Sequence, residues 1–392
     1  MSNLMNTYSR LPVAFSHGKG VWLWDSNGKR YLDGLSGIAV NTLGHAHPRF
    51  TAALSTQIDK LIHVSNLYQV SEQEALADKL CALSNMQEAF LCNSGCEANE
   101  AAIKLARMYG HNKGVESPNI IVMEKAFHGR TLATLSATGN RKVQAGFEPL
   151  VKGFVRVPYN DLDAIHQVAE HNHDVVAILV EPIQGEGGIR IPDIHYLEQL
   201  RKICDQHGWL LMLDEVQCGV GRTGKWFAHQ HTSMLPDVMT LAKGLGGGVP
   251  VGACLAAGKA VGTFKPGNHG STFGGNPLAS VAALTILSII EQDNLLAQST
   301  ATGHFLLQGL QERLGQLAGV TTIRGQGLII GIELSKPCGE LVKQALAQGL
   351  LINVTADNVI RLLPALIFNQ ADAQELLNIL CPLITDFLAL SA

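Results

Sequence analysis

The sequence predicts an α/β protein built on a mostly parallel sheet covered by helices. Short apolar runs without alternation recur along the chain, and helical stretches separate them. Such runs are typical of parallel strands that are covered on both faces. We therefore predict strands over residues 120–123, 175–180, 209–213 and 238–242.

Several of these runs end on a charged residue, namely Glu124, Glu181, Asp214 and Lys243. In open α/β sheets, ligands bind beyond the carboxyl ends of the strands, so the active site is predicted there. Between the second and third runs, a helical stripe over residues 197–204 followed by a glycine at 208 predicts a helix that connects two parallel strands.

Beyond about residue 276 the pattern changes. Helical material begins at residues 278–290, residues 321–334 form a predicted hairpin, and residues 360–364 form a predicted strand. These features predict a large central domain and a smaller α+β domain at the C-terminal end.

Composition narrows the function classes. The 392 residues carry a net charge of −4 without a basic block, so we expect neither a nucleic-acid nor a membrane partner. Eight scattered cysteines form no paired CxxC array, and the three HxH pairs lack a third ligand at metal spacing, so we expect reduced thiols and no metal. No apolar run approaches the roughly 18 residues of a membrane span, and a cytoplasmic protein is expected.

Asp214 and Lys243 are the main candidates for chemistry. They follow successive predicted strands and lie 29 residues apart. A pyridoxal phosphate enzyme needs a lysine to hold the cofactor and a carboxylate to keep its ring nitrogen protonated. Each residue alone has an ordinary structural interpretation, as a helix cap or a surface lysine. Their joint position favours the functional one.

Two glycine-containing stretches compete for a phosphate-binding role. Ser94 and Glu97 form a capping box at the start of a predicted helix, where backbone N–H groups can hold a phosphate, although ordinary capped helices share this pattern. Residues 219–224 match the GxGxxG pattern of dinucleotide-binding enzymes. Neither a small-residue helix nor an acidic strand end follows at the required spacing, so we interpret this stretch as a turn.

Six motifs resemble the class III, pyridoxal-phosphate-dependent aminotransferases, and they run in the family's order over nearly the whole chain. They are GIAVNTLGHAHP at 37–48, CNSGCEANEA at 92–101, FHGRT at 127–131, LDEVQ at 213–217, LAKG at 241–244 and STFGGNP at 271–277. The resemblance implies a fold type I enzyme that acts as a homodimer with shared active sites. It also implies an N-terminal segment at 1–48 packed with the small domain, a large cofactor-binding domain at 49–275 and a small domain at 276–392.

The resemblance also implies which residues bind pyridoxal 5′-phosphate. Lys243 is the implied Schiff-base lysine, and Asp214 is the implied partner of the ring nitrogen. The other implied cofactor residues are Ser94, Gly95, Cys96, Phe127, Glu215, Val216, Gln217 and, from the neighbouring subunit, Thr272. Cys96 departs from the family, which usually has alanine or threonine there. A backbone N–H donor is unaffected by this difference.

The substrate residues follow from the same resemblance. Arg130 and Arg361 match carboxylate-binding arginines, Ser271 assists at the acylornithine end, and Glu186 matches a switch residue that pairs with Arg361. The implied reaction transfers the terminal amine of N2-acetyl-L-ornithine to 2-oxoglutarate, a step of arginine biosynthesis. The products are N-acetyl-L-glutamate 5-semialdehyde and L-glutamate.

Several alternatives stay open at this point. Succinyldiaminopimelate, succinylornithine, ornithine or 4-aminobutyrate is an alternative amine donor, although Ile38 stands where ornithine aminotransferases have a tyrosine. A nicotinamide-dependent dehydrogenase would bind its cofactor at residues 219–224. A non-catalytic binding protein would lack Lys243 or Asp214, and both are present.

Overall fold

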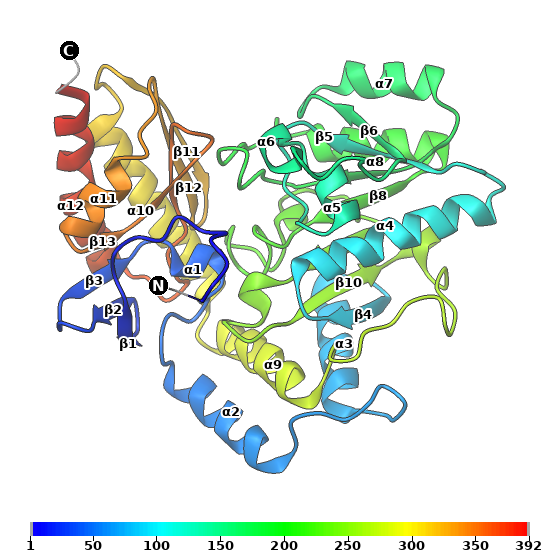
Figure 1. The fold of residues 1–392 in the computed structure, drawn as a ribbon, viewed down its shortest axis with the longest axis horizontal. Helices are drawn as coiled ribbons and strands as arrows, with labels where there is room; N and C mark the ends of the chain where they lie inside the picture. Colours follow the sequence, from blue (N-terminus) through cyan, green and yellow to red (C-terminus); the bar gives the residue numbers. More distant parts are fainter. Residues whose placement is uncertain (1–2, 390–392) are drawn as a thin grey trace.

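A seven-stranded sheet forms the centre of the larger lobe, on the right in Figure 1, in the order β4-β10-β9-β8-β7-β5-β6. This structure is a computed structural model, and it describes residues 3–389. The strands are β4 (Glu88–Cys92), β5 (Asn119–Met123), β6 (Phe154–Val157), β7 (Val175–Val180), β8 (Leu210–Asp214), β9 (Val238–Leu241) and β10 (Gly252–Ala256). The α/β class and the four predicted strands are confirmed.

One strand differs from the parallel pattern. β10 runs antiparallel to both β4 and β9, whereas the neighbouring pairs from β9 to β6 are parallel. Its sequence, GACLA, is short and rich in small residues, so the strand gives no distinct signal. The sequence therefore predicted the parallel core of the sheet but not its antiparallel edge.

Successive side chains of the central strands enter two different apolar layers. In β7, Ile178 and Val180 pack with Leu200 of α8, whereas Ala177 and Leu179 pack with residues of α4 on the opposite face. This alternation explains why the strand reads as continuously apolar, because both of its faces are covered. The helices of this lobe are α3 (Ser71–Ser84), α4 (Gly95–Asn112), α5 (Leu132–Ala137), α6 (Arg141–Gln144), α7 (Leu162–His171) and α8 (Tyr196–His207), with 3-10 turns η1 (Ala228–His231), η2 (Lys243–Leu245) and η3 (Gly258–Ala260).

The predicted connecting helix is α8. It ends at Gly208, which has φ of 67°, and the N–H of Gly208 donates to the carbonyl of Cys204. A residue in the left-handed region at this position is usually glycine, because only glycine adopts it without a steric cost. The chain can then turn directly into β8.

The smaller lobe, on the left in Figure 1, joins both ends of the chain. β13 pairs in parallel with β3, so a C-terminal strand extends the N-terminal sheet β1-β2-β3-β13. A second sheet, β11-β12-β15-β14, contains the predicted hairpin and strand. The elements of the smaller lobe are β1 (Phe15–Lys19), β2 (Trp22–Asp25), β3 (Arg30–Asp33), α1 (Ser36–Ala39), β11 (Val320–Gln326), β12 (Ile329–Leu334), α11 (Leu341–Ala347), β13 (Leu350–Leu351), β14 (Asn353–Thr355), β15 (Val359–Leu362) and α12 (Gln370–Ala389). The domain division at residues 48 and 275 stays a prediction.

Two long helices connect the lobes. α9 (Pro277–Gln292) packs on α2 (Pro48–Lys60) and α3, and α10 (Leu295–Leu314) continues into the smaller lobe and packs on α12. Asn276 caps α9 by accepting a hydrogen bond from the N–H of Ala279. Within residues 3–389, no single helix is long and apolar enough to cross a membrane, and α9 with α10 reaches that length only as a pair bent by 69°.

The GxGxxG stretch at 219–224 forms a turn, as predicted, and belongs to a tightly packed junction between the lobes. Arg222 is buried in this turn, donates to the carbonyls of Leu328 and Pro364, and accepts the N–H of Leu328. Beside it, α10 contacts the β11–β12 turn so closely that a Cβ at Gly303 would lie 2.2 Å from the carbonyl oxygen of Gly327. The junction therefore requires a glycine at 303.

Replacing a core residue tests this packing. Ile178 is fully buried between β7 and α8, so Ile178→Ala should lower the free energy of unfolding by about 2–5 kcal/mol, because it leaves a cavity. Urea denaturation followed by circular dichroism measures this change. Ile194 is 81% exposed, and Ile194→Ala should change the same quantity by less than about 0.5 kcal/mol. Equal effects of the two substitutions would contradict the described core.

Candidate active site

A cavity of about 370 Å³ opens at the carboxyl ends of the central strands. Pockets for small molecules in proteins typically measure about 300–1,000 Å³, so its size suits a cofactor with part of a substrate. The predicted residues that line it are Ser94, Gly95, Cys96, Phe127, Arg130, Glu186, Asp214, Val216, Gln217 and Lys243. The fold thus brings together residues from four of the six sequence motifs, and it adds Glu186 to them.

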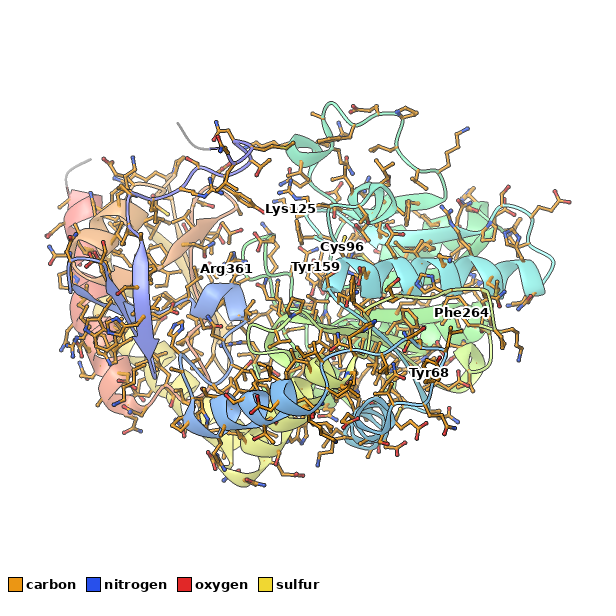
Figure 2. The ribbon with its side chains drawn as sticks, turned by 60° about the horizontal axis from the view of Figure 1, so that its bottom comes forward. Tyr68, Cys96, Lys125, Tyr159, Phe264 and Arg361 are labelled. Atoms are coloured by element: carbon orange, nitrogen blue, oxygen red, sulfur yellow. The ribbon has the colours of Figure 1, made fainter. Side chains whose placement is uncertain are left out.

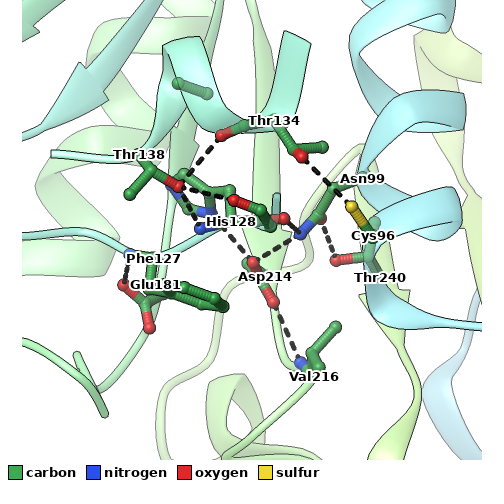
Figure 3. Close-up of polar contacts among 12 residues, drawn as sticks. Cys96, Asn99, Phe127, His128, Thr134, Thr138, Glu181, Asp214, Val216 and Thr240 are labelled. Carbon is green, nitrogen blue, oxygen red and sulfur yellow. Dashed lines mark hydrogen bonds and ion pairs between the residues drawn. The ribbon is translucent and has the colours of Figure 1, made fainter. Parts of the chain in front are cut away.

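Asp214 ends β8 and is the centre of a buried hydrogen-bond network (Figure 3). Its Oδ2 lies 2.8 Å from His128 Nδ1 and accepts a hydrogen bond of 2.7 Å from Asn99 Nδ2, while Oδ1 accepts the N–H of Val216 at 3.0 Å. Asn99 is itself fixed, because its Oδ1 accepts a hydrogen bond from Thr240 on β9. A carboxylate that is 4% exposed is thereby held in one orientation at the pocket wall.

Lys243 follows β9 and reaches the same cavity. Its φ is 42°, a left-handed value that costs a lysine of order 1–3 kcal/mol and that clusters at functional sites. Burial lowers the pKa of the Lys243 amine, and the charge of Arg361 lowers it further, although the carboxylates of Glu186, Asp214 and Glu181 oppose this shift. Among residues 3–389 the amine has no hydrogen-bond partner. It is available to a ligand.

The N-terminus of the 18-residue helix α4 opens into the pocket. Ser94 is its N-cap, and its side chain accepts the N–H of Glu97 at 3.2 Å, as the capping-box pattern predicted. The first N–H groups of a helix have no partner inside the helix and attract anions. A Cβ at Gly95 would lie 2.7 Å from Val216, so a larger residue there would displace the loop that follows β8.

Cys96 lies beside this helix terminus (Figure 2), and its sulfur is 3.4 Å from the backbone nitrogens of Arg130 and Thr131. The thiol thus contacts the loop that carries Phe127. The Arg130 guanidinium lies 5.8 Å from the Phe127 ring centre and is otherwise exposed. The cysteine therefore contributes its side chain to loop packing, and its backbone N–H remains part of the helix terminus.

Glu186 and Arg361 form an ion pair at the edge of the cavity. Arg361 is fully buried, and its Nη1 lies 2.5 Å from Glu186 Oε1 and 3.2 Å from Gln217 Oε1. Burial raises the pKa of the Glu186 carboxyl, but the charge and hydrogen bond of Arg361, with help from Lys243, hold it below its usual value. Because the smaller lobe supplies Arg361 and the larger lobe supplies Glu186, the pair connects the two lobes.

Four predicted residues are not among those that line this cavity. Arg361 contacts the lining residues Glu186 and Gln217 without lining the cavity itself. The Glu215 carboxylate points away from it and accepts hydrogen bonds from the N–H groups of Ala228 and His229. Ser271 and the exposed Thr272 line a different hollow, together with Phe273 and Asn93. Within one chain, therefore, the structure does not place Thr272 at the α4 terminus.

Three residues in or beside the network were not among the predicted site residues. Asn99 and His128 orient Asp214, and the buried Glu181 carboxylate accepts the N–H of Phe127 at 3.0 Å and of Gly185 at 3.3 Å. His128 belongs to the FHGRT motif, and Glu181 ends a predicted strand, so both carried a usable signal. Asn99 lies inside a helix, where the sequence gives no sign of its partner.

The described side chains suit pyridoxal phosphate. A helix terminus suits a phosphate, a fixed carboxylate suits a protonated ring nitrogen, and an amine with a lowered pKa suits an aldehyde. His128 Nε2 is buried without a partner, so the pocket wall retains an unsatisfied polar atom. In residues 3–389, no group of three or more His, Cys, Asp or Glu side chains could hold a metal ion.

Comparison with known proteins agrees with this arrangement. Residues 4–384 match the family "Aminotransferase class-III". An acetylornithine aminotransferase of Nitrosomonas europaea is 62% identical over 99% of both chains. An ornithine aminotransferase structure from Toxoplasma gondii, reported with partial occupancy of PLP at its active site, has a TM-score of 0.94 at 30% identity and covers 98% of this chain and 92% of its own. An acetylornithine aminotransferase structure from Elizabethkingia anophelis has a TM-score of 0.87 at 34% identity, and the match covers 98% of this chain and 96% of that structure's chain. This chain belongs to the class III aminotransferase family.

Proposed function

We propose that this protein is a pyridoxal-phosphate-dependent aminotransferase that transfers the terminal amine of N2-acetyl-L-ornithine to 2-oxoglutarate. One combined observation carries the proposal: Lys243 and the fixed Asp214 carboxylate line one pocket, in a chain 62% identical to an acetylornithine aminotransferase. The products are N-acetyl-L-glutamate 5-semialdehyde and L-glutamate. Class III aminotransferases use pyridoxal 5′-phosphate.

The chain's residues divide the task of holding the cofactor. The N–H groups of Gly95 and Cys96 with the Ser94 side chain would hold the phosphate, and Phe127, Val216 and Gln217 would hold the ring. Asp214 would be the partner of the ring nitrogen, and Lys243 would be the covalent attachment point. When bound, the cofactor supplies an electron-withdrawing ring that stabilises negative charge at the carbon bearing the substrate amine.

Lys243 then acts as the acid–base group. Its lowered pKa increases the fraction of neutral amine near neutral pH, and a neutral amine can remove the proton from the carbon that bears the substrate amine. The hydrogen bonds that Asp214 accepts from Asn99 and from the Val216 N–H keep its carboxylate in one orientation during this step.

Carboxylate recognition distinguishes the two amine donors. Arg130 binds the carboxylate of acetylornithine, with Ser271 assisting, and Arg361 binds the α-carboxylate of glutamate or 2-oxoglutarate. Arg361 is paired with Glu186 in the structure, so Glu186 must move aside when the second carboxylate enters. A neutral chain can enter beside the closed ion pair, whereas a dicarboxylate has to open it.

We also propose a homodimer with shared active sites. The loop at residues 61–68 lies against residues 271–274, because Asn66 Nδ2 donates to the carbonyls of Ser271 and Gly274. This surface exposes the apolar side chains of Leu61, Ile62, Leu67, Tyr68 and Phe273. An exposed apolar surface of this kind marks an interface. A second copy that covers it would also bring its exposed Thr272 towards the phosphate.

The cysteines support a cytoplasmic location. All eight are free thiols, and six of them are buried. Burial raises the pKa of Cys204 to about 12, which keeps this thiol protonated and unreactive. A reducing compartment preserves such thiols.

Replacing the lysine tests the chemistry. Lys243→Ala should abolish transamination while the circular dichroism spectrum stays that of the wild type, because the variant loses the attachment point and the acid–base group together. The wild-type protein should be yellow and lose its colour when glutamate is added. Wild-type-like turnover by Lys243→Ala, or a colourless wild type that binds nicotinamide instead, would reject the proposal.

A substrate panel tests the choice of amine donor. Steady-state kinetics should give the highest kcat/KM for acetylornithine among acetylornithine, succinylornithine, succinyldiaminopimelate, ornithine and 4-aminobutyrate. The half-buried Ile38 packs against an apolar cluster that includes Ile189 and Leu363 and offers no hydroxyl for a free α-amine. A preference for ornithine would overturn this substrate assignment.

A charge in the exposed apolar surface tests the dimer. Leu67 is 86% exposed, so Leu67→Asp leaves the folded chain intact but places a carboxylate in the proposed interface. Light scattering after size-exclusion chromatography should show a monomer with little activity. The control Ile194→Asp changes an equally exposed residue outside this surface and should remain dimeric. A wild-type monomer with full activity would exclude shared sites.

A further inference from the structure

The segment at residues 184–190, here called the bridging loop, is held by both lobes. On the side of the larger lobe, Glu181 Oε1 accepts the N–H of Gly185, and Gln184 Nε2 donates to the carbonyl of Glu124 at 2.9 Å. Gln184 and Arg190 also pair with each other through an isolated antiparallel bridge. The base of the loop is therefore fixed to the sheet that carries Asp214.

The tip of the bridging loop is held by the smaller lobe. Arg324, on β11, donates from Nη2 to the carbonyl of Gly188 at 2.5 Å and from Nε to the carbonyl of Ile189 at 2.7 Å. Its Nη1 donates to Glu333 at 2.6 Å, which orients the guanidinium. Thr355, on β14, donates to the carbonyl of Glu186 at 2.5 Å. The backbone around Glu186 is thus fixed on both sides.

The partner of Glu186 is held independently. Arg361 Nε donates to Asn353 Oδ1 at 3.0 Å, and Arg361 is fully buried in β15 (Figure 2). Loosening the bridging loop would therefore move Glu186 and leave Arg361 in place. The strength of the ion pair depends on how firmly the loop backbone presents the Glu186 carboxylate to Arg361.

We propose that Arg324 is a positioning residue that sets the preference between the two amine donors, by holding the Glu186 backbone so that its carboxylate closes over Arg361. The inference rests on the proposed function, in which a dicarboxylate must open this pair. If the loop is released, Glu186 competes less well for Arg361. Dicarboxylates should then bind more tightly, and the preference for acetylornithine should fall.

A purely electrostatic role for Arg324 makes the opposite prediction. A positive charge near the pocket attracts carboxylates, so its removal would weaken dicarboxylate binding. The substitution Arg324→Lys separates the two explanations, because lysine keeps the positive charge but cannot donate to two carbonyls in the planar geometry of a guanidinium. Arg324→Lys should resemble the wild type if charge matters and Arg324→Gln if positioning matters.

Glutarate is a suitable probe, because it has two carboxylates but neither an amine nor a ketone and cannot react. Calorimetry on the cofactor-loaded enzyme should show that Arg324→Gln and Arg324→Lys bind glutarate about three- to tenfold more tightly than the wild type, the effect of losing one or two ordinary hydrogen bonds. Their ratio of kcat/KM for glutamate to kcat/KM for acetylornithine should rise in parallel. The near-isosteric Thr355→Val should show a smaller change in the same direction, and it serves as the test if the Arg324 variants do not fold.

Arg313→Gln is the matched control. Arg313 is an exposed arginine of the smaller lobe that contacts Asn378 on α12, so its removal changes the net charge equally without touching the bridging loop. It should leave glutarate binding and the kinetic ratio unchanged. Unchanged or weaker glutarate binding by the folded Arg324 and Thr355 variants would overturn the inference. A wild-type enzyme that does not transaminate acetylornithine would instead overturn the proposed function.

Discussion

The burial of one carboxylate, Asp214, is the constraint on which the rest of the site depends. A carboxyl group with 4% exposure is costly to bury unless hydrogen bonds replace those to water. Here α4, the loop after β5 and the loop after β8 each supply one partner. These elements span residues 99 to 216 of the sequence, and all three contact the same carboxylate. The same residues line the cavity, next to the N-terminus of α4.

The two lobes contribute unlike parts to the same pocket. The larger lobe supplies rigid strand ends, including Asp214 and Glu181, whereas the smaller lobe supplies Arg361, which is buried without losing its charge partner. The burial of this arginine is compensated by Glu186, Gln217 and Asn353, which accept hydrogen bonds from its Nη1 and Nε. In the proposed function, substrate recognition therefore depends on the contact between the lobes, and the cofactor chemistry depends on the sheet.

Much of this arrangement could be predicted from the sequence, for identifiable reasons. Strands that are covered on both faces read as continuous apolar runs, so β5, β7, β8 and β9 were predicted together with the charged residues at their ends. The small-residue strand β10 had no such pattern. Asn99 was missed because a single polar residue inside a helix does not reveal which distant group it contacts. Thr272 lies outside the cavity of its own chain. Its assignment to the neighbouring subunit came from the family resemblance and stays a prediction.

The junction around Arg222 has a consequence for movement between the lobes. There the turn at 219–224, α10 and the β11–β12 turn approach at backbone distance. Arg222, which has no carboxylate partner among residues 3–389, donates its hydrogen bonds to carbonyl groups of the smaller lobe. Burial lowers the pKa of Arg222 to about 9. Because these backbones are in contact, the two lobes cannot slide past each other at this junction without a steric clash. If one lobe rocks against the other, backbone contact at this junction makes it the point that moves least.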